Sequence, residues 1–392
     1  MENMKTKYWA LFILIAWMLP LIGLVLTTQV VAAEAQQAGQ GAFDQKQKFT
    51  HFRVGNKNVK TIYPDGPLIW VGTTGGVIRY DTRDDTFKIY GATNGLLSNG
   101  VFFVGKIKGR IAVGSYGGGL SLFDEISSSW KHFNIPDGLG DAFVYDVLEV
   151  ANGDLWIATW SGVNRVRGGD LNDPTKWDLF TIENTKGGLP NDWVYGLAEG
   201  KKGELWMATE GGVARFANNK WDNWNHAKGV GTPFEKVKNA IDFKGDPGPA
   251  SDHHAKQKQE MGLQAVNVAY NPNYIIALEV DQAGQVWAGT WGGGLSRYDG
   301  LKWTNYSTFE GLPGNHVFML HRDDRQQLWI GTNKGLALWQ NGIFKVMTAS
   351  DGLFDNNVFS MATSMDGSKW VGSYGGVAHL RTMDSPQVGS RQ

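Results

Sequence analysis

The residues best suited to chemistry are seven aromatic and polar side chains that stand beside short recurring motifs. Aromatic faces offer apolar contact to flat rings, and a nearby carboxylate or imidazole adds hydrogen bonds. This combination suits a sugar or another flat ligand better than it suits catalysis. The candidate ligand-binding residues are Phe143, Trp160, Trp193, Glu210, Tyr274, Trp291 and His316.

These candidates occupy two positions of an internal repeat that vary while the residues around them recur. Seven of the fourteen residues at the two positions are aromatic, against 12% of the chain. A position that only packs would recur, so the variation favours a ligand-binding face; the alternative is that these aromatics cap the repeats. The first position holds Asn58, Gly100, Phe143, Trp193, Tyr274, His316 and Asn357, and the second holds Thr74, Tyr116, Trp160, Glu210, Trp291, Asn333 and Tyr374.

The elements that position these residues are short strands around a Trp-Gly-Thr string. Copies are 41 to 50 residues apart, with a single gap of 81. Four short strands at this period are typical of a propeller blade, in which the recurring tryptophan packs between blades. The copies are I-W-V-G-T at 69–73, I-A-V-G-S at 111–115, L-W-I-A-T at 155–159, L-W-M-A-T at 205–209, V-W-A-G-T at 286–290, L-W-I-G-T at 328–332 and K-W-V-G-S at 369–373.

The two ends of the repeat region complement each other. The last copy stops after its third strand at 377–380, and F-T-H-F at 49–52 has the spacing of the missing fourth strand. We therefore predict an all-β fold, a single seven-bladed β-propeller over 49–380, in which the N-terminal strand closes the last blade. Residues 36–48 would be a linker and 381–392 a tail.

Two insertions interrupt the pattern. The longer one, 225–264, lacks the Trp-Gly-Thr string, so it is predicted to be a loop with room for a short helix rather than an eighth blade. A shorter one, 166–176, falls between the third and fourth strands of its repeat. The longer loop carries Asp252, His253 and His254, with His226 upstream. Adjacent histidines chelate one ion poorly, so a lid, a docking loop or a solvated loop is preferred to a metal site.

The repeats resemble the two-component regulator propeller repeats of bacterial periplasmic sensors. The residues that carry the resemblance are G-L-P-G-N-H-V at 311–317 with L-W-I-G-T-N-K-G-L at 328–336, and G-L-P-N-D-W-V at 188–194 with L-W-M-A-T-E-G-G-V at 205–213. The resemblance implies an exported, non-catalytic sensor, and the aromatic residues at the variable positions favour a carbohydrate or another small ligand. It does not extend to a kinase, so a signal would pass to a partner protein in the cell envelope.

The first 35 residues have the plan of a secretory signal. Lys5 and Lys7 precede an apolar run at 8–26, and small residues follow at Ala32, Ala33 and Ala35. The run is close to the length of a membrane span, so an uncleaved N-terminal anchor is the alternative. Either interpretation predicts a periplasmic or extracellular protein, with membrane contact only through 8–26.

Composition excludes several classes of function. The formal net charge is -1, from 37 basic and 38 acidic residues, so no basic surface for nucleic acid is expected. The chain has no cysteine, which excludes disulfides and thiolate metal sites. No motif calls for a cofactor, and none is expected.

Two alternatives to a sensor stay open. Streptogramin lyases resemble this chain in blade number and use histidine and glutamate with Mg²⁺ on one face. Here His316 and Glu210 occupy the variable positions, but another blade lies between the two blades that carry them. A joint catalytic role would therefore need a substrate that spans the channel. The other alternative is a protein-docking scaffold in the envelope, for which a flat apolar patch would be expected.

Overall fold

The structure is a computed structural model, and it describes residues 48–241, 259, 261, 262, 264, 266 and 268–381. The predicted signal segment, the linker up to residue 47, the tail from 382 and the histidines at 253 and 254 lie outside the described residues. No helix among the described residues is both long enough and apolar enough to cross a membrane.

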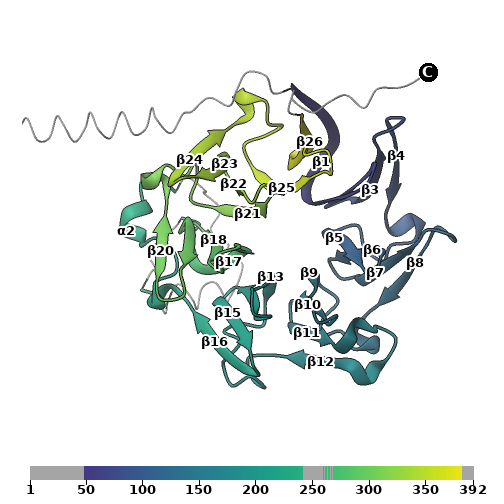
Figure 1. Ribbon diagram of the computed structural model, residues 1–392, viewed down its shortest axis with the longest axis horizontal. Coiled ribbons are helices and arrows are strands. Elements are labelled where there is room, and N and C mark those ends of the chain that lie inside the picture. Colours follow the sequence, from purple (N-terminus) through teal and green to yellow (C-terminus); the bar gives the residue numbers. More distant parts are fainter. Residues whose placement is uncertain are drawn as a thin grey trace, which may run out of the picture. The chain divides into compact units, whose positions relative to one another are not determined.

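The described chain is built from antiparallel sheets of consecutive strands arranged around a common axis (Figure 1). Five of these sheets have four strands each, and in each the first strand is nearest the axis. They are β5–β8 (Val101–Ile107, Arg110–Ser115, Gly119–Asp124, Ser129–Phe133), β9–β12 (Val144–Glu149, Leu155–Thr159, Gly162–Val166, Trp177–Phe180), β13–β16 (Val194–Glu199, Leu205–Thr209, Gly212–Ala217, Lys220–Trp224), β17–β20 (Asn271–Val280, Val286–Trp291, Leu295–Tyr298, Trp303–Tyr306) and β21–β24 (Val317–Arg322, Leu328–Thr332, Gly335–Gln340, Ile343–Met347).

The sixth sheet joins the two ends of the chain. Its order is β25-β26-β1-β2-β3-β4, in which β26 pairs with β25 through one half and with β1 through the other. Phe49 pairs with Leu380 and Phe52 with Val377, which confirms the predicted closing strand and supplies its register. The strands are β25 (Val358–Thr363), β26 (Lys369–Arg381), β1 (Lys48–Asp65), β2 (Leu68–Thr73), β3 (Gly76–Asp81) and β4 (Thr86–Tyr90).

The two long strands, β1 and β26, each change partner at a break in register. β1 pairs with β26 up to Arg53 and once more at Asn58, opposite Tyr374, and it pairs with β2 from Val59 onward. We interpret this sheet as two four-stranded blades joined at that break, which yields the seven units that the repeats predict. The all-β propeller fold is confirmed.

The recurring tryptophan packs between blades, as its repetition predicts. Trp70 is fully buried and contacts Phe123 of the next sheet, with ring centroids 5.5 Å apart. Trp370 contacts Tyr80 across the closure at 5.9 Å. Trp156, Trp206 and Trp287 make the same contact with an aromatic ring on the third strand of the following blade.

The Gly-Thr motif holds the turn between the second and third strands. The Thr209 hydroxyl donates to the carbonyl of Gly212 at 2.8 Å and accepts from the amide of Gly211. Gly212 has a φ of 128°, and a side chain there would meet the carbonyl of Trp224 at 2.2 Å. Only glycine fits this turn, which explains why it recurs.

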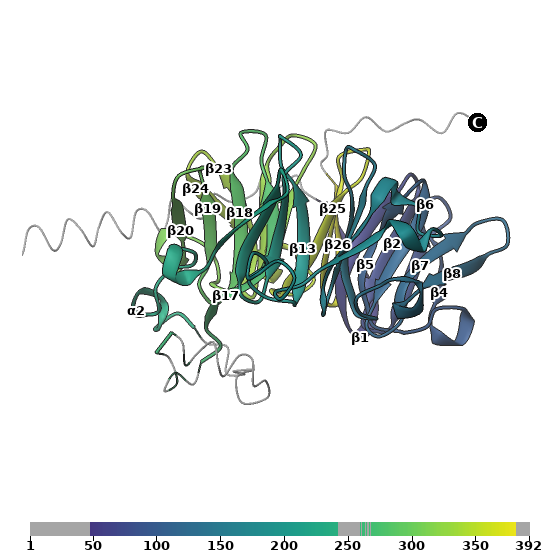
Figure 2. The same ribbon diagram turned by 90° about the horizontal axis from the view of Figure 1, so that it is seen from below.

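The two insertions lie where the sequence places them. Residues 167–176 form two 3₁₀ turns, η3 (Arg167–Gly169) and η4 (Pro174–Lys176), between β11 and β12. The longer insertion, predicted over 225–264, includes η5 (His226–Lys228) and the expected short helix, α2 (Phe234–Val237). Figure 2 shows the strands running between two loop-bearing faces, with α2 on one of them.

Asp146 links the inner strands of two neighbouring blades. Its carboxylate accepts from the backbone amides of Leu197, on β13, and Val147. Burial raises the pKa of Asp146 to about 6, from an ordinary value of 3.8, although the two amides oppose the shift. The folded state therefore binds a proton more tightly than the unfolded chain. The contribution of this group to the stability of the fold is lost as pH rises from about 4 to about 6.

Asp146→Asn is expected to abolish this pH dependence. The shift in pKa corresponds to at most about 3 kcal/mol. At pH 4 the protonated Asp146 stabilises the wild type, and at pH 7 this stabilisation is gone. The free energy of unfolding of the wild type relative to Asp146→Asn should therefore fall by up to that amount from pH 4 to pH 7. Urea unfolding at the two pH values measures it. An unchanged difference would show that Asp146 titrates normally.

Candidate functional site

The structure joins the two variable positions by a backbone hydrogen bond in five of the blades. The backbone amide of the second position donates to the carbonyl of the first: Trp160 to Phe143 at 3.3 Å, and Glu210 to Trp193 at 3.1 Å. The same bond joins Thr74 to Asn58, Tyr116 to Gly100 and Asn333 to His316. The two variable positions are therefore neighbours in space, because they lie at the same end of the first and second strands.

Four aromatic side chains from blades two to four form a continuous arc, which we call the rim arc: Tyr116, Phe143, Trp160 and Trp193. Consecutive rings meet edge to face, with centroids 4.3, 4.8 and 4.7 Å apart. In an edge-to-face pair the edge of one ring meets a face of the other, so each ring keeps at least one face that this contact does not cover. Tyr116 is 49% exposed and the other three are half-buried, so the arc reaches solvent.

The predicted residues of blades five and six form a second group, in which Tyr274 and Trp291 are half-buried and His316 is buried. Tyr274 stacks on Trp291 at 5.7 Å, and Trp291 meets His316 edge to face at 4.9 Å. His316 is only 1% exposed, and its Nε2 lies 2.7 Å from the carbonyl of Ala269, which follows the long insertion. The expectation that His316 lines an open face is therefore corrected, because the returning chain covers it.

Glu210 is also buried, although we expected it beside the aromatics at the surface. Its exposed fraction is 0%, and its Oε2 accepts from the Tyr195 hydroxyl at 2.9 Å. Burial, together with the carboxylate of Glu210, raises the pKa of Tyr195 and of Tyr274. Both phenols therefore stay neutral and can donate or accept hydrogen bonds at the inner end of the arc.

The sequence analysis missed a third position of the repeat, which we call the third column: the residue directly after the first valine or isoleucine of the strand nearest the axis. Contacts run from Phe102 to Tyr145 at 4.6 Å, from Tyr145 to Tyr195 at 4.9 Å, and from Phe318 to Phe359 at 5.2 Å. Lys60 ends the series with its ammonium 5.0 Å from the Phe359 ring, and burial lowers the pKa of Lys60. The same comparison of repeats, moved by one residue, would have found this column.

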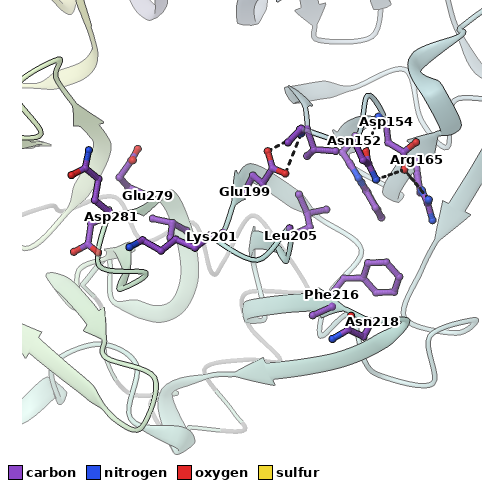
Figure 3. Close-up of a pocket in the computed structure, with 18 of the residues that line it drawn as sticks. Asn152, Asp154, Arg165, Glu199, Lys201, Leu205, Phe216, Asn218, Glu279 and Asp281 are labelled. Atoms are coloured by element: carbon purple, nitrogen blue, oxygen red, sulfur yellow. Dashed lines mark hydrogen bonds and ion pairs between the residues drawn. The ribbon is translucent and has the colours of Figure 1, made fainter.

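A separate cavity of about 880 Å³ lies on the opposite face, at the turns between first and second strands (Figure 3). Its charged groups mostly pair with one another or with backbone. Arg165 contacts Asp154 at 2.7 Å, and Glu199 accepts from the amide of Ala151. Glu279, 3.7 Å from Arg322, has its pKa raised to about 7 by burial. Because most of its charges are already paired, this cavity is less suited to recognise a ligand than the rim arc is.

The described part of the chain contains no group of three or more histidine or acidic side chains arranged to hold a metal ion. His226, a candidate in the sequence, lies 2.7 Å through Nδ1 from the carbonyl of Val230. That contact holds the end of η5, so it gives His226 a structural role and not a role in metal binding.

Comparison with known proteins agrees with the repeat pattern. The model of the two component regulator propeller family matches residues 138–161, 188–211 and 311–334. The chain contains repeats of the two component regulator propeller family. Each matched segment of these regulator propeller repeats ends at or just after the second variable position. No curated protein matches the sequence at a significant level.

Solved structures share the fold of the regulator propeller repeats at low identity. The extracellular domain of the BT4673 system of B. thetaiotaomicron has 17% identity and a TM-score of 0.60 over 86% of this chain, which spans only 40% of that domain. A catalytically inactive virginiamycin B lyase from Staphylococcus aureus, with quinupristin, has 13% identity and a TM-score of 0.58 over 85% of this chain and 99% of the lyase. YCF48 bound to a D1 peptide has 12% identity and a TM-score of 0.54, over 87% of this chain and 99% of that one.

Proposed function

We propose that this protein is an exported, non-catalytic sensor propeller that binds a carbohydrate or another flat small ligand at the rim arc. The observation that carries the proposal is the run of edge-to-face rings from Tyr116 to Trp193, half-buried but open to solvent. Aromatic faces that flank hydrogen-bonding groups are a common means of holding sugar rings. Regulator propeller repeats and the predicted signal segment support a sensor outside the cytoplasm.

A binding role fits the polar groups better than a lyase role does. His316 and Glu210 are held by different partners, Ala269 and Tyr195, and both are buried. A general base must be within hydrogen-bond reach of the proton that it removes. The similarity to virginiamycin B lyase is one of fold, and we propose no catalytic residue or cofactor for this chain.

The first test is an array of carbohydrates and metabolites on the purified protein, followed by calorimetry on the strongest ligand. Trp193→Ala is expected to weaken binding at least about tenfold, the effect of losing one buried aromatic contact. The melting temperature should fall by only a few degrees, because Trp193 is half-buried at a face. Trp221, half-buried on an outer strand, supplies the matched control: Trp221→Ala should leave the affinity unchanged. Equal binding by wild type and Trp193→Ala would contradict the assignment.

A further inference from the structure

Six of the seven connections between blades share one design. Each contains a Gly-Leu or Gly-Val pair, and the apolar member is buried to 3% exposure or less: Leu96, Leu139, Leu189, Val230, Leu312 and Leu353. In five of them a 3₁₀ turn precedes the glycine: η1 (Ala92–Asn94), η2 (Ile135–Asp137), η5, η7 (Thr308–Glu310) and η8 (Ala349–Asp351). Each buried side chain plugs the gap between two neighbouring blades.

The fourth strand of the following blade packs against this connection. Trp130 approaches Gly95 so closely that a side chain on that glycine would meet it at 2.9 Å, and Trp177 approaches Gly138 in the same way. Two residues further along the strand, a polar side chain bonds to the connection in several blades. Asn305 donates to the carbonyl of Gly229, and His51 Nε2 lies 2.7 Å from the carbonyl of Gly352.

The seventh connection, at the closure of the ring, has no 3₁₀ turn and no Gly-Leu or Gly-Val pair, and its buried apolar side chain is Val54, at 8% exposure. Only residues 54–57 separate the part of β1 that pairs with β26 from the part that belongs to the first blade. Phe87 stands where the other blades have Trp130 or Trp177, yet it is 67% exposed. Ile89, which is 45% exposed, stands where several other blades use a polar residue to bond the connection.

Beside Val54, this connection leaves a groove of about 400 Å³ where the other blades have the Gly-Leu or Gly-Val turn; we call it the seam groove. Its apolar wall comes from β1, β3 and β4, and it is large enough for two or three side chains. The lining residues that the argument uses are Phe52, Arg53, Lys57, Tyr80, Phe87 and Ile89.

The charges at the edge of the seam groove are unbalanced. Within residues 48–241 and 268–381, neither Arg53 nor Lys57 forms an ion pair or a side-chain hydrogen bond, and Arg53 lies over the Phe354 ring at 5.5 Å. The one acidic lining residue, Asp85, accepts from the Tyr80 hydroxyl at 2.6 Å. An occupant with a carboxylate next to its apolar side chain would complement these two cations.

We propose that the seam groove docks an acidic Gly-Leu turn of a partner protein, which occupies the place that a Gly-Leu or Gly-Val turn fills in the other blades. The occupant is inferred from the six plugs that fill the equivalent gap elsewhere in this chain. Residues 348–357, T-A-S-D-G-L-F-D-N-N, show the required chemistry, since Leu353 is buried and Asp351 and Asp355 flank it. The site is separate from the rim arc, so it does not depend on the ligand proposed above.

A synthetic peptide with the sequence of residues 348–357 tests the proposal against the full chain, by fluorescence anisotropy with a labelled peptide. We expect saturable binding that weakens at least about tenfold when serine replaces the leucine of the peptide. Phe87→Ser should weaken it to a similar extent. Arg53→Gln combined with Lys57→Gln should weaken it several-fold at low salt and less at high salt.

Phe309, 81% exposed on η7, provides the matched control. Phe309→Ser should leave peptide affinity unchanged, and none of these exposed substitutions should shift the melting temperature by more than a few degrees. Equal affinity in wild type and Phe87→Ser would overturn the proposal, as would the absence of binding. Binding that appears only after residues 1–45 are deleted would assign the groove to the chain's own N-terminal segment and would also overturn it.

Discussion

Trp70→Ala is expected to lower the free energy of unfolding by about 3–5 kcal/mol, the range for large aromatic side chains removed from a core. Trp70 is fully buried, stacks on Tyr90 at 5.9 Å and meets Phe123 of the next blade at 5.5 Å. Alanine would leave a cavity between two blades that the paired strands cannot close. Equilibrium unfolding in urea measures the loss.

Two comparisons separate packing from other effects of this substitution. Trp70→Phe should cost clearly less, because Nε1 of Trp70 has no hydrogen-bond partner among the described residues and a ring is retained. Phe309→Ala, at an exposed position, should stay within about 0.5 kcal/mol of the wild type. A loss below 1 kcal/mol for Trp70→Ala would contradict the account of blade packing.

Deleting residues 48–53 is expected to have a still larger effect, because it removes the strand that closes the ring. Val377 and Leu380 are buried against this strand, and Phe52 lies 5.5 Å from Tyr80 across the seam. The edge of β26 would become unpaired. We expect a melting temperature lower by roughly 10 °C or more, together with poor solubility, as measured by circular dichroism and soluble yield.

A shorter deletion supplies the control for the closing strand. Removal of residues 36–46 stops before β1 begins, and it should leave melting temperature and solubility close to those of the full chain. Unchanged melting after deletion of 48–53 would mean that the ring does not depend on this strand.

The sequence predicted those features that depend on repetition. Copies of one motif must make the same local contacts, so the strand order, the packing of Trp70 and the placing of 49–52 beside 377–380 could be predicted without coordinates. The adjacency of Phe143 and Trp160 followed in the same way, because both stand at the same end of paired strands.

Features that break the repeat could not be predicted from it. His316 is buried because Ala269 returns from an insertion that has no counterpart in the other blades. Glu210 is buried because Tyr195, in a column that was not compared, reaches it from the neighbouring strand. The seam groove likewise arises from one short connection. It is recognised only by comparison with the other six connections, in which a buried leucine or valine fills the equivalent gap.

The central claim, that ligands bind at the rim arc, is tested most directly by a crystal structure of the protein with its strongest ligand from the array. The account predicts ligand density against the faces of Phe143, Trp160 and Trp193, with hydrogen bonds to neighbouring polar groups. Ligand density in the cavity on the opposite face, between Arg165 and Glu279, with the rim arc empty, would contradict it.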